Sequence, residues 1–190
     1  MKYFKHIIIF IFINFLTFSS FANEFVGIIG AGVGEVKNQN NQKLENGSKI
    51  FYGDTIIVGS KSTAQVLFLD QTVMTLGEES ELIIDEFVYD PQTNDGKFVS
   101  NIKSGTIKII TGKISKKDPD NLEIKIPTGA IGARGTEFVV LANSKNENTV
   151  LLLGPGPNNS LGMTPGNLEV TDGVNSVSII QPGFETVVTN

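Results

Sequence analysis

Two groups of carboxylates could do acid–base chemistry in this chain of 190 residues. Asp85 and Glu86 are adjacent, and Glu78, Glu79 and Glu81 precede them. Two acids at a set separation are sufficient for glycoside hydrolysis. Adjacent residues of a strand point to opposite faces, however, and the three glutamates fall in a predicted turn. Neither group is therefore expected to form a paired catalytic site.

The other side chains of common catalytic and metal sites are scarce. The chain has no cysteine and no tryptophan, and its one histidine, His6, lies in the apolar leader described below. This composition excludes triads with a histidine base, and zinc sites built on imidazole or thiolate. We therefore expect no enzyme, no catalytic residue, no metal site and no cofactor.

Arg134 is the only arginine among 15 basic residues. Its guanidinium is a flat fork of donors that grips carboxylates, whereas lysine carries a mobile point charge. Two interpretations follow. In the first, Arg134 is a buried latch that pairs with Asp54, Asp70 or Glu137. In the second, it faces a groove and holds an anionic ligand. We favour the latch, which predicts that Arg134→Lys destabilises the protein by about 3–5 kcal/mol.

The elements that must position these residues are short strands. Apolar runs rich in Ile, Val, Thr and Phe recur between Gly, Asn, Asp and Pro, and none keeps a helical period over three turns. This pattern predicts an all-β fold of one domain, with a twisted, solenoid-like or rolled sheet. The predicted strands are 25–29, 55–58, 64–69, 73–76, 82–89, 106–110, 122–126, 137–141, 149–153, 168–171, 174–180 and 186–189.

Three further features bear on this architecture. Both alternating faces of 64–69 are largely apolar, which predicts a strand that is buried on both sides or lies between stacked sheets. Asn94, Asp95 and Gly96 predict a hairpin turn. The spacing of Gly105–Gly112 recurs in Gly166–Gly173 and suggests similar β-units, while 154–166, dense in Gly and Pro, is predicted to be a surface loop.

The first 22 residues have the composition of a signal peptide. Lys2 and Lys5 precede an apolar run from Ile7 to Phe18, and Ser20 to Ala22 supply small residues for cleavage. The run is shorter than the ~20 residues of a membrane-spanning helix. We expect residues 23–190 to be periplasmic or secreted, with no membrane span. Without Lys2 and Lys5, 13 basic and 20 acidic side chains remain, and this net charge of −7 argues against nucleic acid as a partner.

One stretch resembles a known family. The sequence IPTGAIGARGTEF, from Ile126 to Phe138, is similar to the signature of the FecR domain, the extracytoplasmic module of bacterial iron-dicitrate-type transport regulators. The similarity extends over Gly53–Phe87 and Asn101–Ile109, so that the signature region is about 50–142 and the strands of 147–190 are expected to pack on it. The chain departs from the family at 70–72, where Asp-Gln-Thr replaces the usual Asp-Gly-Ser. The signature and structural positions are Gly53, Asp54, Asp70, Gly105, Arg134, Gly135 and Thr136.

The resemblance implies a non-enzymatic binding module of the bacterial envelope. Members of the family relay transporter status through a membrane helix to a cytoplasmic segment that controls a sigma factor. This sequence shows neither part, so a signalling or ligand-sensing role requires a separate membrane partner. The alternative is a structural envelope protein that contacts polysaccharide or outer-membrane components. In both cases the expected partner is an envelope protein or polysaccharide, and the oligomeric state stays open.

Overall fold

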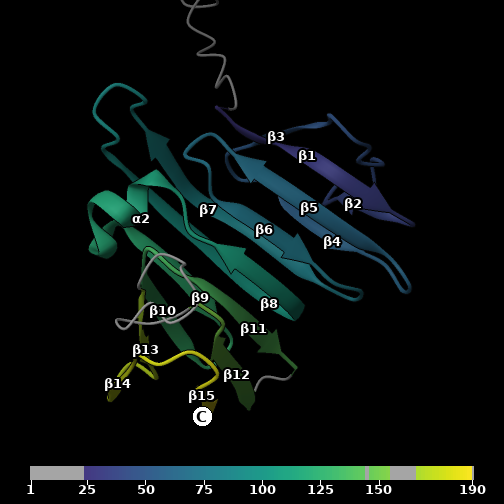
Figure 1. Ribbon diagram of the computed structural model, residues 1–190. Coiled ribbons are helices and arrows are strands. Elements are labelled where there is room, and N and C mark those ends of the chain that lie inside the picture. The colour runs from purple at the N-terminus through teal and green to yellow at the C-terminus, as the bar shows by residue number, and fades with distance from the viewer. Residues whose placement is uncertain (1–23, 144–145, 155–165, 190) are drawn as a thin grey trace, which may run out of the picture.

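The computed structural model describes residues 24–143, 146–154 and 166–189. These residues form one hydrogen-bonded network of fifteen strands with one short α-helix, α2, and one 3₁₀ turn, η1 (Figure 1). The predicted all-β class with a rolled sheet is therefore confirmed. The elements are β1 (Phe25–Val33), β2 (Val36–Asn38), β3 (Lys49–Phe51), β4 (Thr55–Val58), β5 (Thr63–Phe68), β6 (Val73–Leu76), β7 (Glu81–Tyr89), β8 (Gly96–Ile110), α2 (Lys113–Lys117), η1 (Pro119–Asn121), β9 (Leu122–Ile126), β10 (Gly129–Arg134), β11 (Glu137–Ala142), β12 (Glu147–Leu152), β13 (Asn167–Thr171), β14 (Ser176–Ile179) and β15 (Glu185–Thr189).

The strands divide into two layers that share β8. Sheet A has the order β3-β1-β5-β6-β8-β11-β12-β15. Sheet B has the order β2-β4-β7-β8-β9-β10-β13-β14, and every pair in both sheets is antiparallel except β8 with β9. Both sheets thus begin with the N-terminal strands and end with the C-terminal strands.

Strand β8 passes from one sheet to the other at Gly105. Residues 96–104 pair with β7 in sheet B, whereas residues 105–110 pair with β11 in sheet A. Gly105 has a φ of +91°. A backbone in this left-handed region turns sharply, and glycine adopts it without steric penalty. The bend brings the inner faces of the two sheets together.

The core lies between the two layers. Phe68 of sheet A packs against Phe87 and Phe98 of sheet B, with ring centroids 5.8 and 4.6 Å apart. Strands of both sheets, such as β5 in sheet A and β9 in sheet B, alternate buried and partly exposed residues, as the period of two requires. Of the two alternatives for 64–69, burial on both sides was wrong, because Leu69 is 46% exposed and Leu67 lies over Gly30 at one surface.

Several predicted elements are confirmed, and others were missed. Most predicted strands match the observed bounds within two residues. The exceptions are 25–29, since β1 continues to residue 33, 106–110, which is only the last part of β8, and 174–180, of which 176–179 form β14. Asn94 takes a φ of +59° in the hairpin turn between β7 and β8. The similar segments 105–112 and 166–173 are not neighbours, since β8 does not pair with β13. The elements missed by the sequence analysis are β2, β3, β10 and the first half of β8.

Two sequence predictions lie outside the described residues: the signal peptide of 1–22, and most of the loop 154–166. Among the residues that the structure describes, no helix has the length and apolar character needed to cross a membrane.

Candidate functional site

Arg134 is exposed at the end of β10. Ile131 and Ala133 of this strand are 0% and 1% exposed, so the alternation of the strand turns the next side chain outward. Within the described ranges the guanidinium makes no ion pair. The prediction of a buried latch was therefore wrong.

The three carboxylates proposed as partners of Arg134 all have other contacts. Asp54 accepts from the Phe51 amide at 2.8 Å and from the Gln39 side chain at 3.3 Å. Asp70 accepts from Thr72. Glu137 pairs with Lys108 at 2.5 Å across the β8–β11 ladder. The acids of the signature region are thus satisfied locally and leave Arg134 free to meet another anion.

The backbone beneath Arg134 is held on both sides by hydroxyl groups. The Ser115 hydroxyl of α2 donates to the Ala133 carbonyl and accepts from the Gly135 amide. The Thr111 hydroxyl at the end of β8 accepts from the Thr136 amide at 2.8 Å. All these groups are buried, where side-chain hydrogen bonds fix the backbone firmly. Arg134 is therefore displayed on a rigid turn and not on a loose loop.

A second buried turn, at residues 70–72, is hydrogen-bonded to the backbone at the start of α2. Asp70 is 0% exposed, and its carboxylate accepts from the Thr72 amide at 2.9 Å and the Thr72 hydroxyl at 2.8 Å. The Thr72 hydroxyl also accepts from the Gly112 amide at 3.0 Å, and the Asp70 carbonyl accepts from the Lys113 amide at 2.7 Å. Burial raises the pKa of Asp70 above its usual value, although the Thr72 hydrogen bonds oppose this rise. The turn anchors the start of α2.

The signature positions consequently fall into two sets. Asp70, Arg134, Gly135 and Thr136 meet around the end of β8 and α2 through the contacts above. Gly53 and Asp54 form the separate β3–β4 turn, and Gly105 bends β8. Gln71, at the departure from the family pattern, adopts a φ of +72°, so the Asp-turn keeps a left-handed residue without glycine.

Three of the five carboxylates considered for catalysis make structural contacts. Asp85 pairs with Lys125 at 3.3 Å, Glu86 pairs with Lys97 at 2.8 Å, and Glu78 accepts from the Lys61 amide. Asp85 also lies at an irregularity in the β7–β8 register. In the described part of the chain, no three His, Cys, Asp or Glu side chains are placed to hold a metal ion.

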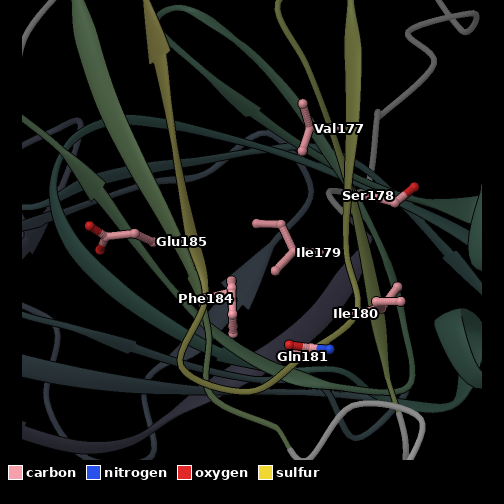
Figure 2. Close-up of a pocket in the computed structure, with 7 residues that line it drawn as sticks. All are labelled: Val177, Ser178, Ile179, Ile180, Gln181, Phe184 and Glu185. Atoms are coloured by element: carbon pink, nitrogen blue, oxygen red, sulfur yellow. The ribbon is translucent and has the colours of Figure 1, made fainter.

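A hollow between β14 and β15 is a feature that the sequence reasoning missed. Figure 2 shows its lining residues, which come from the two last strands and the turn that joins them. The hollow has a volume of about 200 Å³. It is mostly apolar, because Val177, Ile180 and Phe184 are half exposed around Ile179. The available signal was the run of 174–180, which carries no charge.

The exposure of Arg134 changes the result expected from its replacement. Arg134→Lys should leave the free energy of unfolding within about 0.5 kcal/mol of the wild type, since exposed side chains without specific partners contribute little. Urea denaturation followed by circular dichroism measures this difference. A loss of about 3 kcal/mol or more would restore the latch.

These observations define a class of protein, an open two-layer β domain with an arginine displayed on a rigid turn. Comparison with known families then gives the affiliation. The family described as FecR protein matches residues 54–154, and the chain belongs to this family. Comparison with curated proteins finds no match.

The fold is similar to that of a solved structure. It is the crystal structure of a candidate anti-sigma factor from Parabacteroides distasonis ATCC 8503, with a TM-score of 0.51 and 14% sequence identity. The similarity covers 72% of this chain and 55% of that chain, so this chain matches little more than half of the solved protein. At this identity the similarity establishes the architecture alone.

Proposed function

We propose that this chain is a non-enzymatic, exported binding module of the bacterial envelope, which recognises an anionic group and signals through a separate membrane partner. FecR membership supports a regulatory role, and the predicted signal peptide supports a periplasmic or secreted location. The exposed guanidinium of Arg134 is the observation that carries the proposal.

The physical argument concerns the ligand class. Arg134 stands on a turn fixed by Ser115 and Thr111, so little side-chain and backbone order is lost when a ligand binds. The same Ser115 places α2 beside it, and the neighbouring Lys116 is exposed. A guanidinium suits a carboxylate on a partner protein or on a small ligand, because its donors match the two carboxylate oxygens. In residues 23–190, whose net charge is −7, such a cationic position can select an acidic group.

Cross-linked affinity capture tests this proposal. The full chain, expressed with a C-terminal tag in its own cell, should recover one stoichiometric membrane protein that has a cytoplasmic segment. Arg134→Gln should reduce this recovery at least about tenfold, because a charged hydrogen bond contributes about 1.5–3 kcal/mol. Lys103→Gln, which removes an exposed cation from β8, should not reduce it.

Two outcomes would contradict the proposal. Equal recovery with Arg134→Gln and Lys103→Gln would remove Arg134 from the interface. Recovery of cell-wall or polysaccharide material without a specific protein would favour the alternative of a structural envelope protein.

A further inference from the structure

The edge strands at the two ends of the paired sheets differ in how they are protected against pairing with another chain. At the N-terminal end, residues 39–48 return over β2, where Leu44 donates to the Val36 carbonyl at 2.8 Å and Asn38 donates to the Gln42 carbonyl at 3.0 Å. The edge strands β2 and β3 have three residues each and carry Lys37 and Lys49. Short edge strands with lysine resist pairing with another chain.

In the part of the chain that the structure describes, the C-terminal end has none of these protections. Strand β14 pairs only with β13, and β15 pairs only with β12, so no described strand covers either outer edge. Neither strand contains lysine or proline. Figure 1 places both strands at the end opposite β1 and β3. A stacked β fold needs a polar cap at each end, and this end exposes apolar side chains instead.

Val177 shows that the apolar core reaches this end of the sheets and is exposed to solvent there. It pairs with the buried Val170 of β13 and lies on the same strand face as Ile179, which is 4% exposed. Val177 therefore points toward the space between the sheets, yet it is 50% exposed. In Figure 2, Val177, Ile179 and Phe184 surround the same hollow. The interior of the fold is open to solvent at this point.

We propose that a second copy of this chain covers this end, with β14 pairing to β14 and β15 pairing to β15, both antiparallel, about one twofold axis. A single added strand would complete only one sheet. A second copy offers both edges at the same separation, together with the same hollow, and an interface of this self-complementary type closes after two subunits. Both sheets then become continuous across the dimer.

The charges on the edge strands are compatible with this pairing. Strand β14, with the sequence SVSI, has no charged residue. Antiparallel pairing of β15 about Val187 sets Glu185 opposite Thr189, so no two carboxylates face each other. Glu169 lies on β13, and three strand spacings of about 4.8 Å separate it from its copy. That distance exceeds the Debye length of about 8 Å.

Analytical ultracentrifugation of the wild-type protein should give a concentration-dependent mass that reaches twice that of the chain. Val187→Lys places two ammonium groups opposite each other and should raise the dissociation constant at least about tenfold. Val33→Lys, at a site that is 67% exposed on β1 at the opposite end, is the matched control and should leave it unchanged. A monomer at every concentration, or equal effects of the two variants, would overturn the proposal.

Engineered cysteines provide a second test, because the chain has no cysteine. Paired residues of antiparallel strands have Cα atoms about 4.5–5.5 Å apart, within the range that a disulfide bridges. Under mild oxidation, Val177→Cys or Val187→Cys should give a covalent dimer faster than Val33→Cys. Equal rates at all three positions would contradict this interface. The Arg134 capture experiment depends on a different surface, so either proposal can fail alone.

Discussion

Gly105→Ala is expected to destabilise the protein by about 2–6 kcal/mol, as the sum of backbone strain and overpacking. The residue lies at the bend of β8 with a φ of +91°. A Cβ atom there would be 2.2 Å from the Ser80 hydroxyl and 2.5 Å from the Ser80 Cα atom. Part of this clash is with backbone, so a change of side-chain rotamer does not relieve it. Urea denaturation should show a lower midpoint at an unchanged m-value.

Gly173→Ala is the matched control for this prediction. Gly173 has the same φ of +91°, but no atom lies within 4 Å of the position that its Cβ would take. This variant should lose only the strain of a left-handed alanine, about 1–3 kcal/mol. The difference between the two variants measures the contact between β8 and Ser80. If both variants lose the same free energy, the clash at the bend does not limit stability.

The sequence predicted the strands well where one face is continuously apolar. Strands β9 and β11 alternate buried and partly exposed residues over their full length, and both were predicted within one residue. Strand β10 was missed because glycines at 129 and 132 remove the side chains that would show the alternation. The period of two, anchored on Ile131 and Ala133, would have placed Arg134 outward. The rarity of arginine in the chain was a weaker guide than strand direction.

The candidate sites depended on contacts that are distant in the sequence. Asp70 reaches the signature only because Gly112 and Lys113 bond to its turn, about 40 positions later. The hollow exists because β14 and β15 are the last strands of two different sheets, and this order depends on pairing across the whole chain. Local patterns predict that a strand forms, but they do not predict which strand lies at an edge.

Asp70→Ala is the second replacement with a large expected effect. It would leave the buried Thr72 amide without its acceptor and would free the Thr72 hydroxyl that holds Gly112. Unpaired buried donors give an expected loss of about 2–4 kcal/mol. Asp90→Ala is the matched control, because Asp90 accepts in a similar way from the Gln92 amide and the Thr93 hydroxyl in an exposed turn. Thermal and urea unfolding should show a much smaller loss for the control. Equal losses would mean that the burial of Asp70 adds nothing to the turn.

The pH dependence of stability separates burial from turn geometry at these two carboxyl groups. Burial raises the pKa of Asp70, so this group's contribution to stability should fall as the pH rises from about 3.9, the unfolded value, through the raised folded value. The Gln92 amide and the Thr93 hydroxyl lower the pKa of Asp90, so its contribution should be present above that value and lost as the pH falls. The difference in unfolding free energy between wild type and Asp70→Asn should therefore decrease with pH, while that for Asp90→Asn should increase. Slopes of the same sign would show that the buried turn stabilises the ionised form of Asp70, and the anchoring of α2 would then depend on its charge.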